Sequence, residues 1–348
     1  PVAWLLNKTI LDFAQDVGSL EGELDKWMSE IESYVADDLA EFFPEKGGVA
    51  PNHYFRAYRI SCPSCGGTIP ISNTWWFNSR RGIAVRPKYD GDDLRYEIVN
   101  VPDEVPKSEF DPGEGTVSGG DIECPHCGVV TERDDAVDIF AQGEFEYEVC
   151  AVRYADDIGN TEYYPANENN REAIQKAKEK LESNLRLATL LNQDRYIGYY
   201  DRSAPYGIKR WRDVFSPRQL LSHATYLEAF ESVKPDVKEE YEQEKAEAIL
   251  TLLSFIPIKI VERNTRLVPI DASYGCPNPM LGTNNFSFQW HFAETNMMAG
   301  TYSYQTEAKN VIENYEEVVS YLSHLNEKKT TILQGDAADL PLDDSSIE

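Results

Sequence analysis

The chain has 348 residues, of which 41% are hydrophobic and 11% aromatic, and its formal net charge is −27. This composition is typical of a globular protein with room for two or three domains, and it excludes an intrinsically disordered chain. No apolar run approaches the roughly 18 residues that a membrane span needs, so we expect no membrane partner.

The acidic residues are spread over the whole length of the chain. A surface of this kind repels nucleic acid unless a local basic patch overcomes the repulsion, or unless concentrated salt screens it. The even spread fits a surface adapted to high salt better than it fits an acidic tail.

Two amphipathic helices are expected at the start of the chain, over residues 1–13 and 20–43. Proline is tolerated in the first turn of the first helix, and Pro44 followed by two glycines ends the second. Residues 1–18 lack the pattern of a signal peptide, so we expect a cytoplasmic protein. The chain starts on Pro1 without a methionine and stops just after a strand-like stretch, and we therefore expect a segment of a longer protein.

Alternating and aromatic patterns then predict strands at 54–60, 68–71, 74–77, 83–87 and 96–99. Two short cysteine motifs interrupt this region. Cys-Pro-Ser-Cys at 62–65 and Cys-Pro-His-Cys at 124–127 are each followed by glycine. Two thiolates separated by two residues are able to bind one tetrahedral ion, and the glycine relieves the tight turn.

The four cysteines of these knuckles predict a structural Zn²⁺ site with no open position for catalysis: Cys62, Cys65, Cys124 and Cys127. Two disulfides would require an oxidising compartment, and a redox or iron site is the other alternative. The gap between the knuckles is longer than the roughly 15–20 residues of compact zinc ribbons. We therefore expect an elaborated ribbon in which the acidic run 102–120 protrudes as a loop.

The remaining candidate ligands have less specific interpretations. His126, inside the second knuckle, is able to replace a cysteine as ligand, although four sulfurs already suffice. Cys150 and Cys276 stand alone, and a lone cysteine usually behaves as a small buried hydrophobe.

Further helices are expected at 167–191, 217–233 and 236–256, the second of them starting from Ser216 as N-cap and Pro217 in the first turn. The densest basic and aromatic stretch of the chain, 206–219, leads into this helix. Its first turn offers free backbone amides that suit a phosphate. We expect the following residues to contact DNA: Lys209, Arg210, Trp211, Arg212, Arg218 and Gln219. The alternative is a set of arginines paired with neighbouring carboxylates.

A loop at 284–296 mixes aromatic and amide side chains. This composition suits stacking against a nucleic-acid base, and it equally suits packing under a lid. His291 lies in this loop, and a buried histidine with its hydrogen bonds satisfied is a better interpretation than a base catalyst.

The end of the chain reads as a helix at 306–325, a short β-branched strand at 330–333 and a Gly-Asp turn. This order describes one unit of a doubly wound α/β sheet, whose ligands bind at the carboxyl ends of the strands. Gly335, Asp336 and Ala337 are therefore the candidate contacts for a nucleotide-like cofactor.

Four stretches give the chain a resemblance to the adenine-specific DNA methylases that contain an inserted zinc ribbon. They are Pro-Val-Ala-Trp at 1–4, which is similar to the continuation of that family's acidic-x-Asn-Pro-Val-Ala-Trp segment, the two knuckles, the stretch 207–219, and Gly-Asp-Ala-Ala-Asp-Leu-Pro-Leu at 335–342. The resemblance covers most of the chain in order, and its most specific part is 209–219.

The resemblance implies an S-adenosylmethionine-dependent, Rossmann-like DNA methyltransferase. The glycine-rich cofactor loop of that family lies before the position of Pro1, and its catalytic Asp-Pro-Pro-Tyr loop lies after the position of Glu348. No residue of this chain is therefore assigned a catalytic role, and the chain by itself is expected to be inactive. DNA is the implied partner, together with other subunits of a restriction–modification or host-defence system.

The expected fold class is α/β, a partial Rossmann-like core with a large insertion that carries a β-rich zinc ribbon and helices. The expected segments are core helices at 1–50, the zinc ribbon at 51–150, a helical DNA-contacting insertion at 151–300 and a return to the core at 301–348. The alternative is a noncatalytic zinc-ribbon module that binds nucleic acid or protein, and in a third interpretation the ribbon is only a structural staple.

Overall fold

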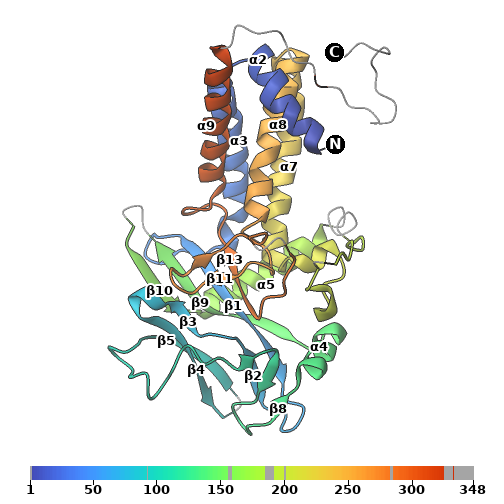
Figure 1. Cartoon of the computed structure of the whole chain (residues 1–348). Coiled ribbons are helices and arrows are strands. Elements are labelled where there is room, and N and C mark those ends of the chain that lie inside the picture. The colour runs from blue at the N-terminus through green and yellow to red at the C-terminus, as the bar shows by residue number, and fades with distance from the viewer. Residues whose placement is uncertain are drawn as a thin grey trace.

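The structure, a computed structural model, describes residues 2–91, 93–155, 159–184, 192–199, 201–282, 285–324 and 332. Long helices stand together as a bundle above a region of curled antiparallel sheets (Figure 1). The fold class is therefore mixed α/β. Gly335, Asp336 and Ala337 lie outside the described residues, as does nearly all of the predicted strand at 330–333.

The bundle is built from four long helices, α3 (Glu21–Leu39), α7 (Pro217–Glu240), α8 (Gln243–Val261) and α9 (Tyr304–Ser323). A short helical lead-in of α1 (Val2–Asn7), the π-helical turn η1 (Lys8–Phe13) and α2 (Ala14–Asp16) packs against its outer end (Figure 1). Every third or fourth side chain of α3 is apolar and buried, as an amphipathic helix requires: Leu24, Trp27, Met28, Ile31, Val35 and Leu39. None of the helices in the described ranges combines the length and the apolar character that a membrane crossing requires.

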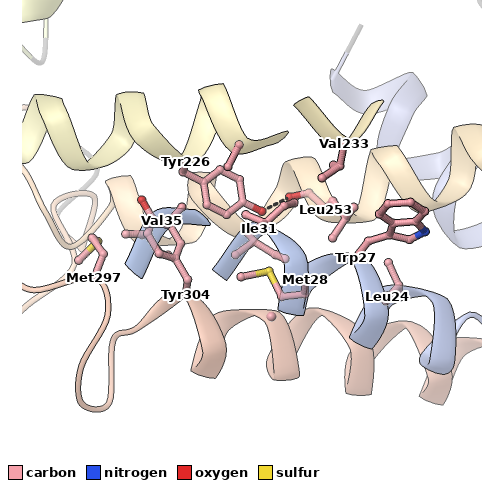
Figure 2. Close-up of a cluster of buried hydrophobic side chains, with 14 of the residues drawn as sticks. Leu24, Trp27, Met28, Ile31, Val35, Tyr226, Val233, Leu253, Met297 and Tyr304 are labelled. Carbon is pink, nitrogen blue, oxygen red and sulfur yellow. Dashed lines mark hydrogen bonds between the residues drawn. The ribbon is translucent and has the colours of Figure 1, made fainter. Parts of the chain in front are cut away.

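Aromatic side chains from different helices meet inside this bundle (Figure 2). Tyr226 of α7 stacks on Tyr304 of α9 with the ring centroids 4.6 Å apart, and its hydroxyl donates to the carbonyl of Leu253 in α8 at 2.9 Å. The Tyr304 hydroxyl donates to the carbonyl of Ser222 at 3.0 Å. The hydroxyls of Tyr226 and Tyr304 thus both have a partner, which removes most of the cost of burying them.

The main sheet has the order β10-β9-β1-β13, with β2 also pairing with β1, and all its pairs are antiparallel. Its strands are β1 (Pro51–Ser61), β2 (Thr68–Ile71), β9 (Glu146–Ala155), β10 (Thr161–Pro165) and β13 (His291–Thr295). β1 pairs along one edge with β13 and then with β2, and along the other edge with β9. The long strand β1 is thus the centre of the sheet.

Two smaller three-stranded sheets complete the β region. The first contains β3 (Trp76–Asn78), β4 (Ile83–Asp90) and β5 (Asp93–Asn100), and the second contains β6 (Val117–Ser118), β7 (Asp121–Glu123) and β8 (Val130–Thr131). The other elements are α4 (Arg133–Gln142), α5 (Glu168–Ser183), the short strands β11 (Ile270–Asp271) and β12 (Cys276–Pro277), and single 3₁₀ turns η2 (Ala40–Phe42), η3 (Ser79–Arg81), η4 (Ala204–Tyr206) and η5 (Trp211–Val214).

The structure confirms the predicted strands before residue 100 and most of the predicted helices, with some shifts of boundary. Ser216 caps α7 as predicted, but the helix continues through Pro235 to Glu240. The break before α8 therefore falls at 241–242 rather than near residue 235. Each named strand pair in the described part is antiparallel, so the parallel sheet of a Rossmann-like core is not seen there.

The four predicted segments share one core. Leu24, Tyr54, Tyr226 and Tyr304, one from each segment, belong to a single cluster of buried side chains. The described part is thus held together by contacts that cross the predicted boundaries at residues 50, 150 and 300.

The acidic run 102–120 was expected to protrude, but residues 112–117 are hydrogen-bonded to the ribbon. The amide of Trp75 donates to the carbonyl of Pro112 at 2.7 Å, and the amide of Val117 donates to the carbonyl of Ser72 at 3.0 Å. A Cβ at Gly115 would lie 2.1 Å from the Ser72 carbonyl oxygen. Only glycine allows the two backbones to approach this closely.

Candidate metal centre and basic surface

The two knuckles come together at the far end of the β region. The first joins β1 to β2, and the second joins β7 to β8. In each, the amide of the first cysteine donates to a carbonyl five residues on, and the following glycine donates back to that cysteine: Cys62 with Gly67 and Gly66, and Cys124 with Val129 and Gly128. Gly66 and Gly128 have φ of 75° and 71°, values that side chains other than glycine rarely adopt.

The four sulfurs are arranged as a tetrahedral metal site requires. All lie within 4.8 Å of one another, with 3.8 Å between Sγ of Cys62 and Cys127 and 3.7 Å between Sγ of Cys65 and Cys124. A Zn–S bond of about 2.3 Å places the corners of a tetrahedron about 3.8 Å apart. The residues therefore fit a zinc ion, and four thiolates leave no coordination position for a substrate.

Electrostatics also favour a cation among these thiols. The backbone amide of Cys65 lowers the pKa of the Cys62 thiol to about 6, against the effect of its burial. Burial and the neighbouring thiols raise the pKa of Cys124. Because the sulfurs repel one another as anions, a bound dication is needed for all four to be charged together.

His126 is not a fifth candidate ligand in this geometry. Its Nε2 lies 3.0 Å from the carbonyl oxygen of Thr68, and its ring meets the edge of Tyr89 at 4.6 Å between centroids. A Cβ at Gly67 would lie 2.6 Å from the imidazole, so the small residue leaves room for the ring. The histidine thus links the second knuckle to the chain that leaves the first.

The other cysteines and His291 have structural environments. Cys150 is buried, and its burial raises the pKa of the thiol, whereas Cys276 is half-buried. Burial lowers the pKa of His291 to about 4, and its Nδ1 lies 3.0 Å from Oγ of Ser72. Ser72 is buried and His291 is half-buried, so packing and this hydrogen bond account for the pair.

The aromatic loop before β13 packs against the protein. Phe288 stacks on Tyr206 with the ring centroids 4.3 Å apart and the planes 8° apart, and both rings meet Phe140 of α4. Trp290 packs at the edge of the same group. The loop was expected either to stack on a nucleic-acid base or to pack against the protein, and Phe288 and Trp290 pack against the protein.

The predicted DNA-contacting residues divide into a buried pair and an exposed group. Arg218 and Gln219 have no exposed surface. Ser216 caps the first turn of α7, with its hydroxyl accepting from the amide of Gln219 while the Gln219 side chain accepts from the amide of Ser216. The helix terminus expected to receive a phosphate is therefore closed by its own cap.

Arg218 is instead the centre of a buried ion network that joins the bundle to the main sheet. Its Nε donates to Glu294 of β13, its Nη1 donates to the carbonyl of Phe42 at 2.7 Å, and its guanidinium lies 3.8 Å from the ring centroid of Tyr54. Arg56 donates to the other oxygen of Glu294 at 2.6 Å. For Arg218 the structure therefore shows the alternative to DNA contact, which is pairing with a carboxylate.

The charges of this network also keep the Glu294 carboxyl group ionised. Burial by itself raises the pKa of Glu294, but the guanidinium groups of Arg218 and Arg56 outweigh it and lower the pKa to about 2. Sequence reasoning missed Glu294, because nothing local marks one acidic residue as the partner of two distant arginines.

The rest of the basic stretch lies at the surface. Lys209, Arg210 and Trp211 are exposed and Arg212 is half-buried. Arg210 donates to the side chain of Asn192 at 2.9 Å, while Lys209 and Arg212 make no side-chain ion pair within the described residues. The structure thus keeps four of the six predicted residues on an accessible surface.

Comparisons of the chain with protein-family models, curated proteins and solved structures found no match.

Proposed function

We propose that this chain is the zinc-bearing, DNA-contacting region of an S-adenosylmethionine-dependent DNA amino-methyltransferase, with the N6 amine of adenine as acceptor. The observation that carries the metal-binding part is the convergence of four thiols on one tetrahedral position. The DNA-contacting part is supported by surface cations that have no ion pair within the described residues of a strongly acidic chain. The methyl-transfer part rests on the sequence resemblance.

Zinc has a structural role in this proposal. Bound by Cys62, Cys65, Cys124 and Cys127, it would fix the hairpin of β1 and β2 to the hairpin of β7 and β8. Cysteines bind metal as thiolates only while they are not oxidised to disulfides, so we place the protein in the reducing cytoplasm. The metal content of the purified chain, measured by mass spectrometry, should be one zinc per chain and should be lost from Cys124→Ser.

The cofactor supplies an activated methyl group, and the contribution of such an enzyme is to position the acceptor amine against it. Gly335, Asp336 and Ala337 are the residues of this chain proposed to border the cofactor. The other subunits of a restriction–modification or defence system are the proposed protein partners.

Calorimetric titration of S-adenosylmethionine tests the methyltransferase proposal. It compares this chain with a version that also carries the residues encoded on either side of it. We expect binding by the longer protein only, with a weaker affinity in Asp336→Ala. If neither protein binds the cofactor, the methyltransferase proposal fails.

A noncatalytic zinc-ribbon module that binds nucleic acid or protein is the second candidate. The observation that favours it is that the named strand pairs of the described part are antiparallel, whereas a methyltransferase core needs a parallel sheet. Zinc binding together with DNA binding, and no cofactor binding by the longer protein, would decide for this function.

A further inference from the structure

Two segments of the basic region pair with each other through the backbone. Residues 194 and 210 form an antiparallel bridge, flanked by hydrogen bonds from the amide of Arg195 to the carbonyl of Lys209 at 2.9 Å and from the amide of Trp211 to that of Gln193 at 3.2 Å. Asp213 accepts from the amides of Lys209 and Arg210 through one carboxylate oxygen. The chain near residue 195 and the basic stretch therefore lie side by side.

The buried side chain of Arg195 ties its own segment to residues 201–208. Its buried guanidinium donates to Asp201 at 2.7 Å and to the hydroxyl of Ser203 at 2.8 Å, and its Nε donates to the carbonyl of Ile208 at 3.1 Å. A buried ion pair with these extra hydrogen bonds holds its backbone in one arrangement. The backbone beside Tyr196 is consequently tied to the segment 201–208.

Large aromatic side chains point outward from these segments. Tyr196 is 84% exposed and Trp211 is 41% exposed. A Cβ at Gly198 would lie 3.1 Å from the ring of Tyr196, so the small residue leaves room for that ring. Exposed rings gain by stacking on a flat apolar partner.

Cations without a carboxylate partner lie on the same segments. Arg202 and Lys209 are exposed and Arg212 is half-buried, and none of the three has a side-chain ion pair in the part of the chain that the structure describes. In a chain with a net charge of −27, a segment such as 192–213, where basic residues outnumber acidic ones, is a local exception. We call Tyr196, Trp211, Arg202, Lys209 and Arg212 the aromatic–cation surface.

The chemistry of this surface matches an unpaired strand better than a duplex. Rings stack on bases only where the faces of the bases are free, as they are in a single strand. A duplex carries one charge per about 1.7 Å of its axis and is wide, so the surrounding acidic surface repels it more strongly than it repels one narrow strand. A few cations flanked by aromatic rings are the usual composition of single-strand binding grooves.

We propose that the aromatic–cation surface binds a single DNA strand, stacking unpaired bases on Tyr196 and Trp211 and pairing phosphates with Arg202, Lys209 and Arg212. This inference rests on the DNA-contacting part of the proposed function and not on methyl transfer. It assigns the loop to a strand that has already been opened, rather than to recognition of a closed duplex.

Fluorescence anisotropy tests the proposal with the full chain and two probes, a labelled thymidine 20-mer and a 20-base-pair duplex. We expect tighter binding of the single strand, and a loss of roughly 5- to 100-fold in Tyr196→Ala, which removes one stacking ring. Three phosphate contacts predict a slope of about −2 in a plot of log affinity against log salt concentration.

Matched variants separate stacking from folding. Trp211→Phe keeps a ring and should retain most of the affinity that Trp211→Ala loses. Tyr34→Ala removes a similarly exposed ring from α3 and should leave the affinity unchanged. Thermal unfolding and zinc content show that each variant is folded, and Tyr196→Ala carries the test if Trp211→Ala does not fold.

Tighter binding of the duplex, or an unchanged affinity in Tyr196→Ala and Trp211→Ala, would overturn this inference. Neither result bears on cofactor binding, which the calorimetric titration measures separately. Absence of cofactor binding together with stacking-dependent binding of the single strand would remove the methyltransferase and keep the inference.

Discussion

The helical bundle and the four-cysteine ribbon, the two hairpins that carry the knuckles, are built differently. The bundle buries apolar side chains from four long helices around one core. In the ribbon, β6, β7 and β8 have only two, three and two residues. Strands this short bury little apolar surface by themselves, so we expect a metal ion at the four cysteines to supply part of the free energy. The bundle is thus stabilised by packing, and the knuckle region is expected to depend on coordination as well.

Removal of zinc should have the largest effect and should be confined to the ribbon. Apparent binding free energies of structural zinc in small domains are about 10–16 kcal/mol, so its loss should unfold the knuckles. Hydrogen exchange with and without a chelator should show lost protection at 62–71 and 121–131, and retained protection in α3 and α8. Cys150→Ala, outside the cluster, should keep its zinc. Simultaneous loss of protection in the bundle would show that the two regions form one cooperative unit.

Acidification should weaken both the bundle and the main sheet through histidines whose burial disfavours the charged form. Burial lowers the pKa of His223 in α7 and of His291 in β13 to about 4, from an ordinary value near 6.5. The unfolded chain therefore binds more protons, so stability is complete above about pH 6.5 and falls as the pH drops toward 4. Each histidine should cost roughly 3 kcal/mol over this window.

Urea unfolding between pH 7 and 5 measures this loss of stability, and NMR titration of the imidazole protons assigns it to each histidine. The zinc content is followed in the same samples. An ordinary pKa at either position would contradict the burial shown here.

Glu294→Gln should break the junction between the bundle and the main sheet. It leaves Arg56 and Arg218 buried without their carboxylate, and the removal of one partner from a buried ion pair costs about 3–5 kcal/mol. Chemical denaturation measures the change in the free energy of unfolding. Asp93→Asn removes the carboxylate of an exposed pair with Arg95, and the expected change is below about 1 kcal/mol. Equal effects of the two variants would contradict the proposed importance of the junction.

Cavities in the two cores should have different consequences. Leu253→Ala, in the middle of the bundle, should cost about 2–5 kcal/mol and lower the stability of the whole described fold. Ile122→Ala, beside the second knuckle, should mainly increase local exchange in the ribbon while zinc holds the hairpins. Hydrogen exchange of both variants provides the test, and a global loss in Ile122→Ala would argue against two separate sources of stability.

Tyr226→Phe should have the smallest effect. It removes the hydroxyl that donates to the carbonyl of Leu253 but keeps the stacked ring, so about 1 kcal/mol should be lost. Thermal unfolding compared with Tyr34→Phe, at an exposed position on α3, measures the difference. A change equal to that of the control would show that water replaces the lost bond.

Local sequence signals were sufficient to predict several parts of this protein. The apolar spacing of α3, the Ser216 cap of α7 and the glycines after each knuckle all act within a few residues of chain. The predicted four-cysteine cluster also forms, because ligand type and spacing restrict what two such knuckles are able to do.

The basic stretch shows where local information ends. In sequence, Arg218 and Arg212 look alike, yet one is buried against Glu294 and the other lies at the surface. Tyr196 becomes a candidate binding residue only because its ring is left exposed on a loop anchored by Arg195. Burial and ion pairing depend on segments far apart in the chain, so the tertiary structure alone decides which cations hold the fold together and which remain available to a ligand.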